Sequence, residues 1–123
     1  MTEYFLIYPQ GKSNYEPYIV GVELKDTEEL LSFLYDTIRC SSIENVYLRN
    51  HPGLIAVVDE EGLFRDNKLN WIISAIYGGR IMGVAVVGQQ GERDGEPDFV
   101  GFASKDEAYQ VSRRIYNDYM KGR

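Results

Sequence analysis

Apolar residues recur along the chain at two periods, and these periods predict its secondary structure. Short runs of aromatic and β-branched residues, ended by glycine, proline or polar residues, are typical of strands. Apolar residues three or four positions apart are typical of one buried helix face. The pattern predicts six strands, at Tyr4–Tyr8, Tyr18–Leu24, Ile43–Arg49, Leu54–Val58, Ile81–Val87 and Asp98–Phe102. Because Leu54–Val58 is continuously apolar, we expect it to be a central strand covered on both faces.

Three helices are predicted, each with a recognisable start or end. The first begins at Asp26, with Glu29 three residues later as in a capping box. The second is predicted over Lys68–Tyr77 and ends at Gly78-Gly79. The third is capped by Ser104 and runs to about Met120. The predicted buried stripes of the first and third helices are Leu30, Leu31, Leu34, Ile38 and Ala108, Val111, Ile115, Tyr119.

The segments between these elements are predicted to be turns and loops. They comprise a polar loop at Gln10–Pro17, turns at Asn50–Gly53 and Asp59–Gly62, and a long polar loop at Gly88–Pro97. The resulting order is ββαββαββα, in which many neighbouring strands are joined by short turns. This order favours an α+β fold, with a mostly antiparallel sheet of five to six strands and two to three helices packed on it.

The composition indicates one domain over residues 1–123, with 44% hydrophobic residues and a net charge of −6. Its single cysteine, Cys40, excludes an intrachain disulfide and a cysteine-based zinc site. No run approaches the roughly 20 apolar residues that span a bilayer, and the start of the chain lacks signal-peptide features. We therefore expect a soluble cytoplasmic protein that has no membrane contact.

The negative charge lies in the first half of the chain. Residues 1–60 hold 10 acidic and 4 basic residues, whereas residues 61–123 hold 9 of each. Such a chain is poorly suited to direct binding of nucleic acid, which needs clustered Lys and Arg. The acidic half favours either simple solubility or a surface that meets a basic partner.

The densest group of carboxylates, Asp59, Glu60 and Glu61, is expected to lie in a solvated turn. His51, the only histidine, is expected in a surface turn, and Cys40 is expected to be a structural, partly buried thiol. The glycine-rich segments match no phosphate-binding loop. We therefore expect no catalytic residue, no metal and no cofactor.

Ten tyrosines are the most unusual count in the composition. Several lie at positions that face the predicted core, but Tyr15 and Tyr18 lie in or beside a polar loop. Tyrosine is enriched at recognition surfaces because it joins a rigid apolar ring to a polar hydroxyl. The candidate interaction residues are therefore Asp59, Glu60, Glu61, Tyr15 and Tyr18.

The middle of the chain carries a combination of motifs. An Asp-Glu-x-Gly turn within Val57–Leu63 is followed by Asn67 or Asn70, by Tyr77 and by the run Ile-Met-Gly-Val-Ala-Val-Val-Gly at Ile81–Gly88. It is preceded by a helix at Thr27–Ile38 and a strand at Ile43–Leu48. Over residues 18–88 the chain resembles a family of small domains of unknown function encoded by bacterial phages, plasmids and other mobile elements. The resemblance implies an accessory gene of a mobile element and transfers no activity.

These observations predict a non-enzymatic protein-interaction module with an unknown protein partner, with a homodimer left open. One alternative is an anti-defence inhibitor that mimics nucleic acid and blocks a host nucleic-acid-binding protein. A second alternative is a small-ligand binder or enzyme that uses the Asp59-Glu60 turn together with His51. The first alternative needs Glu and Asp side chains arrayed on one surface at about the spacing of phosphates. The second needs a pocket where polar groups converge.

Overall fold

The computed structural model describes residues 1–11 and 16–122. Its strands are β1 (Thr2–Tyr8), β2 (Tyr18–Glu23), β3 (Ile43–Tyr47), β4 (Leu54–Asp59), β5 (Ala85–Arg93) and β6 (Glu96–Val100). Its helices are α1 (Thr27–Ile38), α2 (Trp71–Tyr77) and α3 (Lys105–Lys121), and a single 3₁₀ turn, η1, covers Gly62–Phe64. Strand pairs and helices alternate as predicted, so the α+β class is confirmed.

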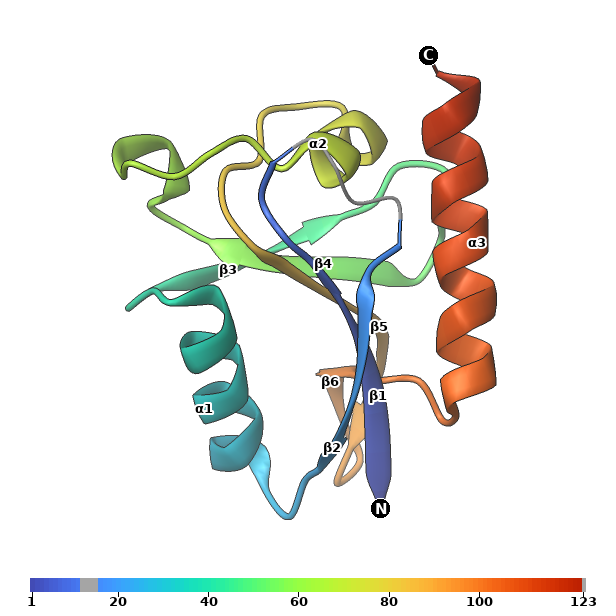
Figure 1. Cartoon of the computed structure of the whole chain (residues 1–123). Coiled ribbons are helices and arrows are strands. Elements are labelled where there is room, and N and C mark those ends of the chain that lie inside the picture. Colours follow the sequence, from blue (N-terminus) through green and yellow to red (C-terminus); the bar gives the residue numbers. More distant parts are fainter. Residues whose placement is uncertain (12–15, 123) are drawn as a thin grey trace.

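All paired strands in the six-stranded sheet run antiparallel. The order along the sheet is β2-β1-β5-β4-β3, and β6 pairs with the far half of β5. Helix α1 covers one face of the sheet, and α2 and α3 cover the other (Figure 1). The path of the sheet therefore ends at β2 on one side and at β3 on the other.

The central position predicted for the strand at Leu54–Val58 is confirmed. All six residues of β4 are buried, because alternate side chains enter the two cores on opposite faces of the sheet. Ile55 and Val57 pack with α1, whereas Ala56 and Val58 pack with α2 and α3. A strand that is apolar on both sides needs this double cover.

The segment Gly88–Pro97, predicted as a long polar loop, is a β-hairpin, so this prediction is wrong. β5 continues into it, the chain turns at Asp94 and Gly95, and β6 returns. Both turn residues have positive φ, which an Asp-Gly pair adopts readily in a two-residue hairpin. A Cβ on Gly88 would lie 2.6 Å from the carbonyl oxygen of Val100, so this glycine permits close strand packing.

Helix α2 begins later than Lys68, because the buried side chain of Asn70 caps it. The Asn70 Oδ1 accepts a hydrogen bond from the Ile73 N–H at 3.2 Å. Its Nδ2 donates to the carbonyl oxygens of Tyr8 and Gly83, at 2.9 and 3.0 Å. One amide group therefore joins the end of β1, the segment before β5 and the start of α2.

Arg93 links β1 to the β5–β6 hairpin. Its Nη1 and Nη2 donate to the two carboxylate oxygens of Glu3 at 2.7 and 3.0 Å, and its Nε donates to Asp98 at 2.9 Å. The Gly101 N–H also donates to Glu3. Partial burial alone would raise the pKa of Glu3, but the hydrogen bonds from Arg93 and Gly101 outweigh it and hold that pKa below its ordinary value.

Replacing Asn70 tests its role as a buried tie. We expect Asn70→Ala to lower the free energy of unfolding by about 3 kcal/mol, because it leaves two carbonyl groups and one N–H without partners. Urea unfolding followed by tryptophan fluorescence measures this change. The exposed Asn45 serves as a matched control, and its replacement by Ala should change stability by no more than about 0.5 kcal/mol. Equal effects at the two positions would contradict the assignment.

The lowered pKa of Glu3 predicts a dependence of stability on pH. A carboxyl whose folded pKa lies below its unfolded value stabilises the fold above the unfolded pKa, and this contribution is lost as pH falls through the folded pKa. We expect the wild-type chain to lose more stability than Glu3→Gln between about pH 7 and about pH 3. Urea unfolding across this range checks the difference, and parallel curves for the two proteins would refute it.

Candidate functional site

The carboxylates of Asp59, Glu60 and Glu61 lie where β4 ends and the chain passes the end of α1. The Glu60 N–H donates to the Ser42 carbonyl oxygen at 3.0 Å. In return, the Ser42 hydroxyl donates to the Glu60 carboxylate. The segment 59–66, which we call the acidic turn, is therefore fixed at its base to the chain that follows α1.

Asp59 is not a surface residue, so its expected place in a solvated turn that contacts a partner is wrong. β4 runs one residue further than predicted, and pairing with Ile43 leaves Asp59 only 5% exposed. Its Oδ1 accepts the Glu61 N–H at 2.9 Å, and its Oδ2 lies 3.2 Å from Nε of Arg65. These partners offset the cost of burying a carboxylate. Asp59 therefore braces the acidic turn from inside, while Glu60 and Glu61 remain exposed.

Two large apolar side chains protrude from the acidic turn, in η1. Leu63 is 60% exposed and Phe64 is 87% exposed. A single exposed apolar residue is ordinary, but two neighbours on a braced turn form a projecting apolar tip. No element predicted from the sequence included them.

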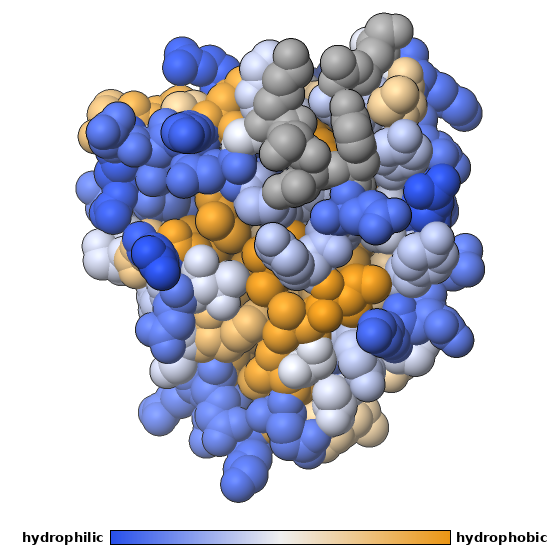
Figure 2. All heavy atoms as spheres, viewed as in Figure 1, coloured by the Kyte–Doolittle hydropathy of each residue, from blue (hydrophilic) through white to orange (hydrophobic). Residues whose placement is uncertain are grey.

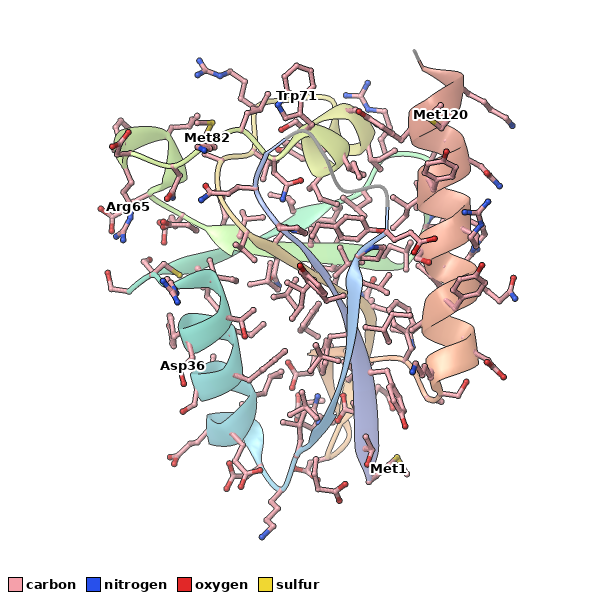
Figure 3. All side chains as sticks on the ribbon, viewed as in Figure 1. Met1, Asp36, Arg65, Trp71, Met82 and Met120 are labelled. Carbon is pink, nitrogen blue, oxygen red and sulfur yellow. The ribbon has the colours of Figure 1, made fainter. Side chains whose placement is uncertain are left out.

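Contacts on both sides hold this tip in place. Nη2 of Arg65 donates to the carbonyl oxygen of Arg39 at 3.3 Å, in addition to the ion pair with Asp59. On the other side, a Cβ on Gly62 would lie 3.0 Å from the carbonyl oxygen of Met82. Figure 3 shows Arg65 and Met82 on either side of the turn. The tip is therefore presented by a preorganised backbone.

An open hollow of about 420 Å³ lies beside the acidic turn, at the end of α1. Its lining residues are Tyr35, Asp36, Arg39, Cys40, Ser41 and Arg65. Burial raises the pKa of the Cys40 thiol, and the nearby Asp59 carboxylate raises it further. A thiol with a raised pKa is a poor nucleophile at neutral pH, which agrees with the expected structural role of Cys40.

His51 is not the surface residue that was expected. Its side chain is 9% exposed, and its Nε2 lies 2.8 Å from Oδ2 of Asp118 in α3. His51 precedes β4 and Asp59 ends it, so the six residues of that strand, about 20 Å, separate them. The geometry therefore does not bring His51 and the acidic turn together around one substrate.

Many carboxylates of the acidic first half make hydrogen bonds within the fold, although most carboxylates of that half are exposed. Six of its ten carboxylates accept hydrogen bonds within the fold, and these belong to Glu3, Glu23, Asp26, Glu29, Asp59 and Glu60. A mimic of nucleic acid needs carboxylates that are free to replace phosphates. This arrangement does not favour the nucleic-acid mimic.

Of the two tyrosines predicted as contact residues, only Tyr18 lies within the described residues. Tyr15 lies outside the described residues, as does part of the predicted loop Gln10–Pro17. Tyr18 is the first residue of β2 and is 64% exposed, as a contact residue would be. The structure therefore places Tyr18 and the acidic turn on different elements.

Within 1–11 and 16–122, no group of three or more His, Cys, Asp or Glu side chains is arranged to hold a metal ion. In the same part of the chain, no helix has both the length and the apolar character needed to cross a bilayer.

Comparison with known proteins gives no relative: no family model, curated protein or solved structure matches the chain. The resemblance to domains of phages and plasmids therefore stays a prediction. The candidate site rests on its geometry.

The sequence reasoning missed the apolar tip and the partner of His51. Leu63 and Phe64 are two adjacent large apolar residues in an otherwise polar stretch after a turn, and this pattern was the available signal. Asp118 is 67 positions from His51, and no spacing in the sequence links them.

The raised pKa of Cys40 predicts slow alkylation and a response to Asp59. The thiol should react with iodoacetamide more slowly than a free cysteine at about pH 8, because less of it is thiolate. Asp59→Asn removes a repulsive charge and should shift the midpoint of the rate-against-pH curve to lower pH. A midpoint that stays fixed, or moves upward, would show that Asp59 does not act on the thiol.

Proposed function

We propose that the chain is a non-enzymatic protein-interaction module that binds through the acidic turn. The observation that carries this proposal is the 87% exposure of Phe64, beside exposed Leu63, on a turn held by the Asp59–Arg65 ion pair. Large rigid side chains on a preorganised turn lose little conformational entropy when they bind. Residues that dominate binding energy at interfaces are commonly aromatic anchors of this kind.

The charges around the tip define the chemistry of its partner. Glu60, Glu61 and Asp66 are exposed around the two apolar side chains, whereas Arg65 is paired with Asp59. A complementary surface has an apolar pocket for Phe64 and Lys or Arg at its rim. We therefore propose a protein partner with a basic rim around an apolar pocket.

The origin in a mobile element and the location in the cytoplasm belong to the same proposal. The resemblance in residues 18–88 and the single cysteine support them. Both fit an accessory protein whose partner is another protein of the host cell.

Capture of the partner and measurement of its affinity test the acidic turn. The wild-type chain is immobilised in extract of the encoding cells, and a protein that it retains above an empty support is purified. We expect its affinity for Phe64→Ala to be at least about tenfold weaker, as for an interface anchor. Thermal unfolding should be unchanged, because Phe64 makes little contact with the core.

Tyr47 provides a matched control, since it is an aromatic residue that is 64% exposed on β3, the strand at one end of the sheet. Tyr47→Ala should retain the same partner with wild-type affinity. The double variant Glu60→Gln, Glu61→Gln should slow association, because it removes charges that attract a basic rim. Equal binding by wild type and Phe64→Ala would overturn the proposal.

A further inference from the structure

Strand β2 forms an end of the sheet, and between Pro17 and Glu23 it lacks the charges and prolines that usually protect an edge strand. In the part of the chain that the structure describes, β2 pairs only with β1. Its residues from Tyr18 to Val22 include no charged residue and no proline. Natural edge strands are commonly blocked by charges, prolines or bulges, because their free backbone groups can pair with another chain.

The pairing of β1 shows which backbone groups of β2 face outward. Tyr4 exchanges two hydrogen bonds with Phe102, at 2.9 and 2.7 Å, so its N–H and C=O point away from β2. Tyr4 lies opposite Gly21, which makes this a non-hydrogen-bonded pair of the β1–β2 ladder. Backbone direction alternates along a strand, so Ile19, Gly21 and Glu23 all turn their N–H and C=O away from β1.

The side chains of β2 and its neighbours make this edge apolar. Ile19, Val20 and Val22 are only partly buried, and each lies beside the exposed backbone. Figure 2 shows a hydrophobic band over β1 and β2 between the polar surfaces of α1 and α3. A small hollow of about 70 Å³ adjoins Ile19 on the α3 side and is lined in part by Tyr109 and Tyr116. An added strand would therefore find side-chain contacts as well as backbone partners.

The charges around β2 indicate the charge that an added strand should carry. Residues 16–29, which contain β2 and the start of α1, hold five acidic residues and one basic residue, a net charge of −4. The Met1 ammonium pairs with Glu23 at 3.0 Å and brings the net charge beside β2 to −3, and Arg113 lines the hollow at Ile19. Two copies of the chain that paired through β2 would bring these acidic segments together. A foreign segment with Lys or Arg beside an apolar centre would instead be attracted.

We infer that β2 is a docking edge for an extended segment of another protein, with apolar residues at alternate positions and Lys or Arg at its ends. The segment adds a strand to the sheet and pairs with the outward N–H and C=O of Ile19, Gly21 and Glu23. This surface is separate from the acidic turn, and it recognises backbone conformation rather than a pocket.

Peptide selection followed by two matched variants tests the docking edge. Random peptides displayed on phage are selected on the wild-type chain, and the most enriched sequence is synthesised with a fluorescent label. Ile19→Pro removes an outward N–H while leaving the β1 ladder intact, and Ile19→Ala removes the side chain but keeps the N–H. We expect the peptide to bind Ile19→Pro at least about tenfold more weakly than Ile19→Ala.

A second measurement does not depend on how the variants fold. Peptides that are N-methylated at one position at a time should lose binding at every second residue, because only alternate amides face β2. Hydrogen exchange should show new protection at Ile19, Gly21 and Glu23 when the peptide binds. Phe64→Ala should bind these peptides as the wild type does, which separates this surface from the acidic turn.

Several outcomes would overturn the inference. These are the failure of any peptide to be enriched, enrichment of acidic peptides, equal binding by the two Ile19 variants, and N-methyl effects without a two-residue period. Sedimentation of the chain without peptide measures whether a second copy of the chain pairs through β2 instead. A dimer that Ile19→Pro dissociates would show that a second copy, rather than a foreign segment, occupies the edge.

Discussion

Strand β1 divides its backbone hydrogen bonds between two sides, and this division determines what the sheet exposes. The even-numbered residue Tyr4 bonds to Phe102, and pairing with β5 continues on the same side from Leu6 to Tyr8. The odd-numbered residues are therefore left to bond with β2. The backbone groups that β2 leaves unpaired at its outer edge are thus determined by the pairing of β1 with Phe102 and β5 on its other side. A one-residue shift in that register would exchange inward and outward groups along the whole edge.

Buried polar groups in this protein join segments that are distant in the sequence. Asn70 connects β1, α2 and the segment before β5, and Asp59 holds the acidic turn through Arg65. Arg93 connects β1 with both strands of the hairpin through Glu3 and Asp98. Asn70 and Arg93 are hydrogen-bonded within the fold, and Asp59 accepts a hydrogen bond at Oδ1 and forms its ion pair at Oδ2, which offsets the cost of burying them. The surfaces left for recognition are consequently apolar in their centres, with charges around them.

The elements that could be predicted from the sequence are those with local signals. The apolar run of β4 and the caps Asp26 and Ser104 act within a few residues, and the structure confirms all three. The hairpin at Asp94-Gly95 also had a local signal, but the glycines around it suggested a loop. Gly88 and Gly91 lie against Val100 of β6, 12 and 9 positions further along the chain, so their role becomes visible only when β6 is paired with β5.

The candidate site was harder to predict, because burial there is decided by partners far along the chain. The side chain of Asp59 enters the fold because β4 gains a pair with Ile43, and that of His51 is covered because Asp118 in α3 reaches it. Neither event leaves a pattern near the residue itself. Tyr18 was predicted as a contact residue because it lies beside a polar loop, yet its exposure comes from the position of β2 at the sheet edge. That position depends on strand order, which the sequence pattern does not specify.

The distribution of charge connects the two recognition surfaces. Residues 16–29 carry a net charge of −4, and residues 59–66, with four acidic residues and one basic residue, carry −3. The chain as a whole carries −6, so the remaining residues together have a net charge of +1. The excess negative charge is therefore concentrated in the two segments that contain the β2 edge and the apolar tip, where Glu23 pairs with the Met1 ammonium and Asp59 with Arg65. A basic partner would be attracted to either surface before contact, and the shape of each surface would decide between an extended strand and a pocket.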